Sequence, residues 1–199
     1  TTLCHNEFTN DINFTSNISG TSYSWTNNNT NIGLAANGTG SQIPSFQVSN
    51  TSNTTITSTI IVTPSLNGCS GLPESFLITV NPIPDVLPTN DTIYCSGNQS
   101  INYIFDGFVL GASYNWSANT VPNSAAIGMP SANGINTIPP FTTTLPGSTP
   151  ISVDITVSPF FLGCTGNSDV FTITVDPTPS INNINDSTYC SGEISPTIF

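Results

Sequence analysis

The stretch "GTSYSWTNN" at residues 20–28 returns as "GASYNWSAN" at residues 111–119. In both copies a tyrosine and a tryptophan lie two positions apart, so on a β-strand their side chains point to the same face. Large aromatic residues at the centre of a β-sandwich fill the space between its two sheets. We therefore predict two equivalent cores; an exposed surface for stacking sugars is the alternative. The aromatic residues concerned are Tyr23, Trp25, Tyr114 and Trp116.

The duplication extends along the chain with a nearly constant period. Cys4 and Cys95 are 91 residues apart, whereas Val80 and Val175 are 95 apart. The second copy therefore gains four residues, which we place within 119–127 because "TVPNSAA" replaces "NTN" there. Repetition of this kind is typical of arrays of similar domains.

The same comparison sets the predicted domain boundaries. A third copy begins where "STYCSGEIS" at residues 187–195 repeats "TIYCSGNQS" at 92–100. We predict a domain at 1–84, a second at 85–179 and the first strand or strands of a third repeat at 180–199. We expect the chain to be a segment of a longer array.

Apolar residues alternate with polar ones inside each copy, as in "TITSTIIVT" at 55–63 and "PISVDITVS" at 150–158. This alternation, bounded by Gly, Pro and Asn, is typical of half-buried strands. We predict an all-β chain of tandem antiparallel β-sandwich domains of immunoglobulin type, arranged as a rod; a small barrel is the alternative. Other candidate strands are 12–18, 21–26, 45–49, 101–105 and 112–117, and no amphipathic helix is expected.

Charge excludes several classes of partner. The chain has no Lys or Arg and 11 acidic residues, for a net charge of −11. Phosphate neutralisation needs basic side chains, so nucleic acid is excluded, as is attraction to anionic lipid headgroups. No stretch approaches the roughly 18 apolar residues of a membrane span, so we expect no membrane insertion.

The five cysteines fit the repeat, with two in each complete copy. We predict disulfides within each copy, which indicates an oxidising, extracytoplasmic location. Closing a loop of about 65 residues would contribute roughly 4 kcal/mol in the chain-entropy model. Reduced, buried thiols are the alternative, and zinc is disfavoured because ligands are too few. The predicted pairs are Cys4–Cys69 and Cys95–Cys164, with Cys190 opening the third copy.

Catalytic groupings are poorly supported, and we predict that the chain is not an enzyme. His5 is the only histidine, so a Ser–His–Asp or Cys–His site is excluded from the second copy. We predict no cofactor, although calcium at the unit junctions is an open alternative because hard cations bind clustered carboxylates. The acids near those junctions are Asp85, Asp91, Asp176 and Asp186.

Each complete copy ends in an Asn/Asp-Pro-x-Pro segment, "NPIPD" at 81–85 and "DPTPS" at 176–180. Prolines spaced in this way fix φ and favour a semi-rigid, extended connection. Short, stiff connections between compact units predict a rod.

The ordered set GxSYxW, IG, IP-x-F, GC-x-G, F-x-ITV-[ND]-P-x-P and YCSG resembles the PKD-like repeats of giant cell-surface adhesins of Bacteroidota, of the SprB type that serves gliding motility. The chain lacks the W-D-F-G-D-G run of ordinary PKD domains. The resemblance implies an Ig-like fold, type IX secretion and a place on the bacterial surface, anchored at the outer membrane. It also implies a stalk that spaces a distal binding region from the cell.

The same resemblance implies O-glycosylation at Asp-[Ser/Thr]-aliphatic-or-Thr. Two such sites, "DTI" at 91–93 and "DST" at 186–188, make Thr92 and Ser187 candidate acceptors. The expected partners are neighbouring repeats of the same chain, with surface polysaccharide or other cell-surface proteins as further candidates. A carbohydrate- or partner-binding module and a subunit of a self-assembling extracellular filament are the alternative functions.

Overall fold

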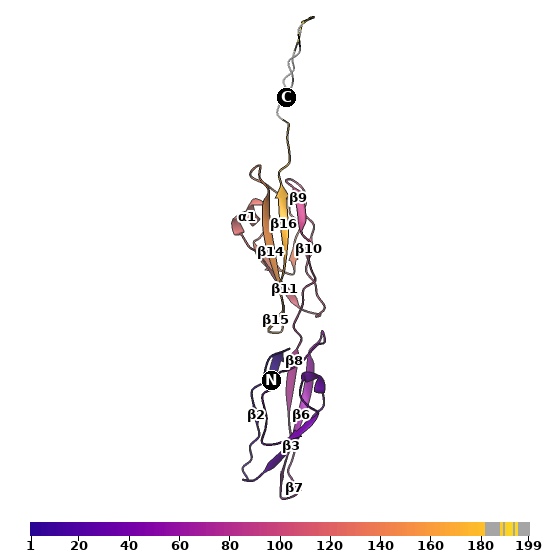
Figure 1. Cartoon of the computed structure of the whole chain (residues 1–199), viewed down its shortest axis with the longest axis vertical. Helices are drawn as coiled ribbons and strands as arrows, with labels where there is room; N and C mark the ends of the chain where they lie inside the picture. The colour runs from indigo at the N-terminus through magenta and orange to yellow at the C-terminus, as the bar shows by residue number, and fades with distance from the viewer. Residues whose placement is uncertain (182–187, 189, 193, 195–199) are drawn as a thin grey trace.

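A computed structural model describes residues 1–181, 188, 190–192 and 194. Repeat 1 (residues 1–84) and repeat 2 (residues 85–179) lie end to end along the long axis (Figure 1). The predicted third repeat, including Ser187 and Asp186, falls largely outside the described residues.

Repeat 1 has one large and one small sheet. The large sheet has the order β1-β8-β6-β3-β4, with β7 paired to the end of β6. The first strand is parallel to its neighbour and the other pairs are antiparallel. The small sheet pairs β2 with β5. The strands are β1 (Thr2–Cys4), β2 (Ile12–Asn13), β3 (Ser22–Asn27), β4 (Asn37–Thr39), β5 (Gln42–Ile43), β6 (Ile56–Leu66), β7 (Cys69–Ser70) and β8 (Glu74–Asn81).

Repeat 2 reproduces this arrangement strand for strand. Its large sheet has the order β12-β11-β14-β16-β9 with β15 paired to β14, and its small sheet pairs β10 with β13. The strands are β9 (Thr92–Cys95), β10 (Tyr103–Ile104), β11 (Ser113–Ala118), β12 (Asn133–Ile135), β13 (Thr137–Ile138), β14 (Ile151–Phe161), β15 (Cys164–Thr165) and β16 (Asp169–Asp176). The predicted fold class of two tandem Ig-like sandwiches is therefore confirmed.

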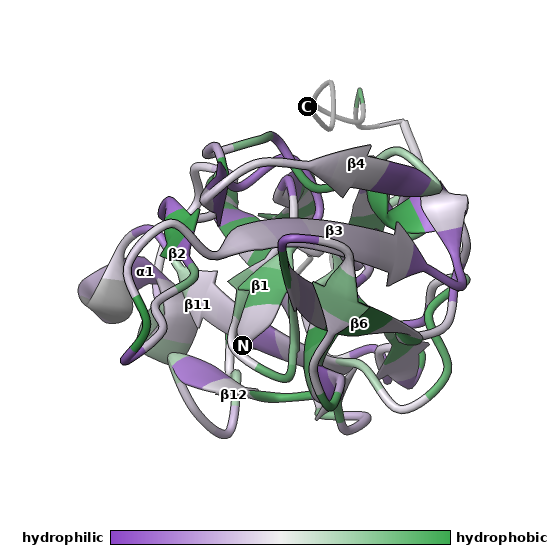
Figure 2. Cartoon of the chain, turned by 90° about the horizontal axis from the view of Figure 1, so that it is seen from below, coloured by the Kyte–Doolittle hydropathy of each residue, from purple (hydrophilic) through white to green (hydrophobic). Residues whose placement is uncertain are grey.

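Each repeat has its own hydrophobic core. In β14 the buried residues alternate strictly, because every second side chain points between the sheets. The view along the long axis shows hydrophobic residues on β6 and β1 of repeat 1 (Figure 2). The core of repeat 1 comprises Trp25, Ile32, Leu34, Ile43, Val48, Ile60, Val62, Ile78 and Val80. That of repeat 2 comprises Tyr103, Phe105, Tyr114, Trp116, Ile127, Met129, Ile138, Phe141, Val153, Ile155, Val157, Phe171, Ile173 and Val175.

Each core tryptophan lies across a glycine of the edge strand. Trp25 pairs with Gly38, and Trp116 pairs with Gly134. A Cβ on Gly38 would come within 2.4 Å of the Trp25 ring, and a Cβ on Gly134 within 2.8 Å of Trp116. Because real Cβ atoms do not approach so closely, glycine is required at both positions.

The structure corrects two local predictions. The four-residue insertion forms a short helix, α1 (Val121–Ala126), where repeat 1 has the 3-10 turn η1 (Thr30–Ile32). The residues expected as a strand at 45–49 form no regular strand, although an isolated bridge joins Gln47 to Phe8 and backbone hydrogen bonds join Phe46 and Val48 to residues 6–9. The ladder is interrupted because the N–H groups of Ser45 and Phe46 donate to side chains, to Asp11 Oδ1 and Thr9 Oγ1.

Candidate functional site

The structure joins the two repeats by a disulfide. Cys4 ends β1 of repeat 1, Cys164 begins β15 of repeat 2, and their Cα atoms are 5.7 Å apart. The two residues are 160 positions apart in sequence. The bond therefore crosses the junction between repeats instead of closing one repeat on itself.

The predicted pairs Cys4–Cys69 and Cys95–Cys164 are wrong, and the strand register gives the reason. Cys4 pairs with Asn81 at the end of β8 next to the junction, whereas Cys69 pairs with Leu66 at the far end of β6. About ten residues of β6 lie between the position opposite Cys4 and the position opposite Cys69, a distance of roughly 33 Å at 3.3 Å per residue. A disulfide needs Cα atoms within about 7 Å. Cys69 and Cys95 are free and exposed.

The linker, residues 82–91, lies against repeat 2. The Leu87 N–H donates to the Asp106 carbonyl at 2.8 Å, and Asp85 Oδ1 accepts from the Phe108 N–H at 2.8 Å. Each hydrogen bond of this kind contributes about 1 kcal/mol. The linker is therefore a docked segment, not a free spacer.

Further contacts hold the residues on either side of Asp85 and Leu87 in the chain. Asp169 Oδ2 accepts from the Thr89 N–H at 2.9 Å, and the Val86 side chain packs against the core of repeat 2. At the junction itself, Asn81 Nδ2 donates to the Leu162 carbonyl at 3.2 Å. The Asn81–Leu162 hydrogen bond and the disulfide cross from repeat 1 to repeat 2, whereas the bonds of residues 85–89 fix the start of repeat 2 on its own sheets.

Two glycines of repeat 2 allow the linker backbone to approach. A Cβ on Gly166 would lie 1.7 Å from the Pro84 carbonyl oxygen, and a Cβ on Gly107 would lie 2.3 Å from the Asp85 carbonyl oxygen. Any larger residue at either position would displace the linker.

The acids considered for calcium make other contacts. Asp85 binds a backbone amide, as above, and Asp91 Oδ1 accepts from the Thr172 N–H at 2.7 Å. Across residues 1–181 and the few described beyond them, no three His, Cys, Asp or Glu side chains gather as in a metal site. Junctional calcium stays an untested alternative to the predicted absence of a cofactor. His5 Nδ1 accepts from the Asn50 N–H at 2.9 Å, which is a structural contact.

The aromatic residues behave differently in the two repeats. Trp25, Trp116 and Tyr114 are buried, whereas Tyr23 is half-buried and contacts Phe14 with ring centroids 5.6 Å apart. In repeat 2 the Tyr103 ring lies 5.2 Å from that of Phe171 and fills the space between the sheets. The counterpart of Tyr103 in repeat 1 is Ile12, which is smaller.

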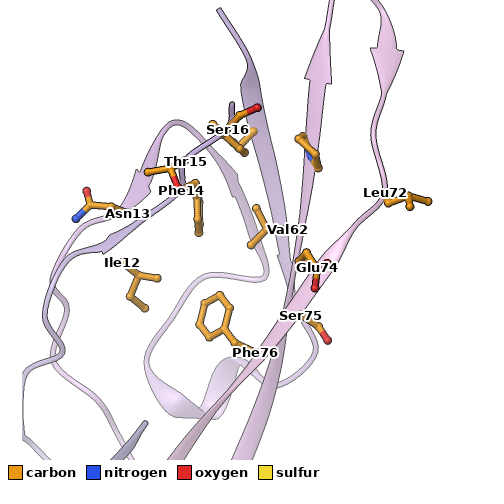
Figure 3. Close-up of a pocket in the computed structure, with 12 residues that line it drawn as sticks. Ile12, Asn13, Phe14, Thr15, Ser16, Val62, Leu72, Glu74, Ser75 and Phe76 are labelled. Carbon is orange, nitrogen blue, oxygen red and sulfur yellow. The ribbon is translucent and has the colours of Figure 1, made fainter. Parts of the chain in front are cut away.

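A pocket of about 310 Å³ therefore opens in repeat 1 (Figure 3). Its apolar lining includes Ile12, Phe14, Tyr23 and Phe76, and the Leu72 side chain at its rim is 88% exposed. The sequence analysis did not anticipate this pocket.

The Tyr103 hydroxyl is the centre of a hydrogen-bond network. It lies 2.6 Å from Thr92 Oγ1 and 3.1 Å from the Tyr94 hydroxyl. Burial, as the largest cause, raises the pKa of Tyr103, as does Tyr94, whereas the bond to Thr92 lowers it. Glycosylation of Thr92 stays a prediction, and a glycan on Oγ1 would remove its proton and leave this oxygen only as an acceptor toward the Tyr103 hydroxyl.

We expect repeat 2 to lose stability above about pH 10. An unfolded tyrosine loses its proton near pH 10, whereas folded Tyr103 keeps it, so the unfolded state binds fewer protons and stability falls as pH rises. The slope contributed by one such group is up to about 1.4 kcal/mol per pH unit. This slope is measured by urea unfolding at several pH values between 8 and about 11. Trp116 fluorescence in a Trp25→Phe background monitors the unfolding of repeat 2.

The matched variant is Tyr103→Phe, which removes the titrating hydroxyl and keeps the ring. Its slope should be shallower but not zero, because burial also raises the pKa of Tyr114. An unchanged slope would contradict the assignment to Tyr103.

Repeat 1 matches a known domain family. A family model described as a PKD-like domain matches residues 1–84. Repeat 2 has the same strand order as this matched repeat. A search of curated proteins found no match to the sequence.

Several solved structures are similar at low sequence identity. The EC1-2 fragment of human protocadherin-24 gives a TM-score of 0.45 at 12% identity, over 90% of this chain and 94% of that chain. The EC1-2 fragment of human mucin-like protocadherin gives 0.38 at 10%, over 90% and 95%. BT4661, a SusE-like surface located polysaccharide binding protein from Bacteroides thetaiotaomicron, gives 0.32 at 12%, over 88% and 32%. All three scores are below 0.5, so the fold rests on this chain's own sheets and on the family match.

Within the described residues, the helices are too short to cross a lipid bilayer, since α1 has six residues.

The functional residues that sequence reasoning missed are the two glycines that lie under the linker. Gly166 recurs as Gly71 within the GC-x-G pattern, and this recurrence is the signal that could have revealed it, whereas Gly107 corresponds to Ser16 and carries no such signal.

Proposed function

We propose that the chain is a structural stalk segment of a large extracellular adhesin. Its repeats hold their neighbours in line and space a distal binding region from the cell surface. The single observation that carries this proposal is the junction, where the Cys4–Cys164 disulfide and the docked linker together restrain one repeat against the next.

The physical argument is mechanical. Domains joined by a flexible linker move independently, and the distance that they span varies with that motion. A covalent bond and a hydrogen-bonded linker remove most of this freedom, so the end-to-end distance of an array is set by its number of repeats. A stalk needs this property, and a catalyst does not.

The finer parts of the proposal rest on the motif resemblance. We place the protein on the surface of a Bacteroidota cell, exported by the type IX pathway, anchored at the outer membrane and serving adhesion in gliding motility. Disulfides form and persist in oxidising compartments, and the inter-repeat disulfide supports this extracellular location. Neighbouring repeats are the proposed partners, and polysaccharide or surface proteins would bind elsewhere on the adhesin.

Deleting one period tests the stalk function. In a cell that produces the adhesin, in-frame removal of residues 85–179 should shorten the surface fibre by one repeat and leave binding to the target surface intact. Electron microscopy measures the length, and an attachment assay measures the binding. Loss of attachment with the fibre otherwise intact would instead favour a binding module, as would glycan binding by the purified chain.

A further inference from the structure

Exposed apolar side chains gather on residues 106–111, in the loop that joins β10 to β11 of repeat 2. Phe108 is 68% exposed and Leu110 is 91% exposed, whereas Val109 between them is 5% exposed. Because Val109 is held in the interior, the residues on either side of it project into water. Single exposed apolar residues are normal in soluble proteins, but neighbouring ones mark a contact surface.

A third exposed apolar residue comes from the linker. Leu87 is 42% exposed, and its N–H donates to the Asp106 carbonyl at 2.8 Å, so it lies beside the start of the loop. The linker hydrogen bonds thus hold the two segments together. We call Leu87, Phe108 and Leu110 the apolar patch.

The apolar patch lies at the end of repeat 2 that faces repeat 1. Ser113, which opens β11 just after the loop, pairs with Phe160. The next residue, Phe161, pairs with Cys164 of the inter-repeat disulfide, and a Cβ on Gly111 would lie 3.9 Å from the Phe161 ring. The patch is therefore continuous with the junction. It stays exposed although both repeats that meet at this junction are described by the structure.

Repeat 1 has polar residues at the same places in its own loop. In the 91-residue register, Phe108 corresponds to Asn17 and Leu110 corresponds to Ser19. Both repeats nevertheless have the same strand order, so the fold does not require apolar side chains at these positions. A contact with another molecule gives these two apolar residues a role that the fold does not.

Two carboxylates adjoin the apolar patch. Asp85 Oδ1 accepts from the Phe108 N–H at 2.8 Å, and Asp106 Oδ1 accepts from the Gly107 N–H at 2.8 Å. Burial, followed by the charges of Asp106 and Asp85, raises the pKa of Tyr114, so both carboxylates act on one point. The chain has no Lys or Arg that could pair with them.

We propose that the apolar patch docks a basic, amphipathic segment of another protein. Apolar side chains of the partner cover Phe108 and Leu110, and its Lys or Arg side chains pair with Asp85 and Asp106. Interfaces combine an apolar centre with complementary charge in this way. A second copy of the chain fits poorly, because it would bring 11 acidic residues and no Lys or Arg to the same carboxylates.

This inference goes beyond the stalk function, since it gives one junction of the stalk a lateral partner. The loop of repeat 1, with Asn17 and Ser19, lacks the apolar part of the site. Attachment is therefore specific to one position along the array.

Selection from a phage-displayed library of random dodecapeptides tests the chemistry of the partner. The library is selected in parallel on the immobilised chain and on the Phe108→Asn/Leu110→Ser variant, which carries the residues of repeat 1 and the same net charge. Peptides enriched only on the unchanged chain should combine Lys or Arg with Leu, Ile, Phe or Trp. Enrichment of the same peptides on both surfaces, of peptides without basic residues, or of none, overturns the proposal.

The affinity of the most enriched peptide, labelled with fluorescein, is then measured by fluorescence anisotropy. Phe108→Asn/Leu110→Ser should weaken binding at least about tenfold, because two apolar side chains are no longer buried on binding. Ile93→Ser/Ile135→Ser is the matched control, since it removes two apolar side chains that are 71% and 62% exposed elsewhere in repeat 2. An equal loss in both variants would show that the peptide does not recognise the patch.

A second pair of variants tests the charges. Asp85→Asn/Asp106→Asn keeps the acceptor oxygens for the two loop N–H groups, yet it should weaken binding and flatten its dependence on salt between about 0.05 and 0.5 M. Asp11→Asn/Asp154→Asn removes the same number of charges elsewhere and should have a smaller effect. Equal effects would mean that net charge alone attracts the peptide, and the proposal would fail.

Sedimentation velocity tests the second copy as occupant. In a Cys69→Ser, Cys95→Ser, Cys190→Ser background, which prevents disulfides between copies at these positions, the chain should be a monomer up to about 100 μM. A dimer that Phe108→Asn/Leu110→Ser abolishes would assign the patch to a second copy and overturn the proposal. The stalk function would remain, because the deletion experiment measures fibre length and does not depend on a lateral partner.

Discussion

Replacing Cys4 with serine should lower the free energy of unfolding by about 5 kcal/mol in the chain-entropy model and loosen the junction. The disulfide closes a loop between residues 160 apart, and cross-links of such long loops restrict the unfolded chain most strongly. In the folded chain the Asn81–Leu162 hydrogen bond and the contact of Pro84 with Gly166 remain at the junction. Guanidinium unfolding measures the first effect, and small-angle X-ray scattering should show a wider range of maximum dimensions.

Cys69→Ser is the matched control, because Cys69 is free and exposed. It should change the free energy of unfolding by no more than about 0.5 kcal/mol. Its range of maximum dimensions in small-angle scattering should match that of the unchanged chain. Cys164→Ser should match Cys4→Ser, and the double variant should be no worse than either. If Cys4→Ser behaves like Cys69→Ser, the inter-repeat disulfide does not restrain the junction.

Replacing Trp116 with alanine should destabilise repeat 2 by about 3–5 kcal/mol, the usual range for a buried aromatic residue. The indole is 3% exposed, lies over Gly134, and donates from Nε1 to the Thr137 carbonyl at 2.9 Å. Its removal leaves a cavity and deprives that carbonyl of its donor. Circular dichroism during urea unfolding measures the loss.

The remaining tryptophan separates the two repeats in this experiment. Because the cores are distinct, Trp25 fluorescence should report a repeat 1 transition that changes little. Ile135→Ala is the surface control, since Ile135 lies beside Gly134 on β12 and is 62% exposed. A change of equal size in both repeats would contradict separate cores.

The fold was largely predictable because its signals are local. Alternation in 150–158 predicts a half-buried strand, and β14 covers most of that range. The insertion was located correctly, but its six-residue helix was not anticipated, since VPNSAA has no amphipathic period. The strand expected at 45–49 is interrupted because the N–H groups of Ser45 and Phe46 donate to the side chains of Asp11 and Thr9, and side-chain acceptors of this kind leave no alternation in the sequence.

The site was predictable only in its components. Cysteines, prolines and glycines recur at the repeat period, yet that period is equally consistent with a bond inside one repeat and a bond to the next. The disulfide partner is decided by how far along the sheet, from the junction end to the far end, each cysteine lies. Cys4 lies at the junction end and Cys69 at the far end, and sequence separation does not contain this information.

By itself, the sequence determined the repeat, its two sheets and the tryptophan at the centre of each core, because alternation and spacing act between residues that are neighbours along a strand. Only the tertiary structure decided that Cys4 bonds to Cys164, that the linker docks on repeat 2, and that a pocket stays open in repeat 1. These contacts join residues about 20 to 160 positions apart. They depend on how one folded repeat is placed against the next, which no local pattern specifies.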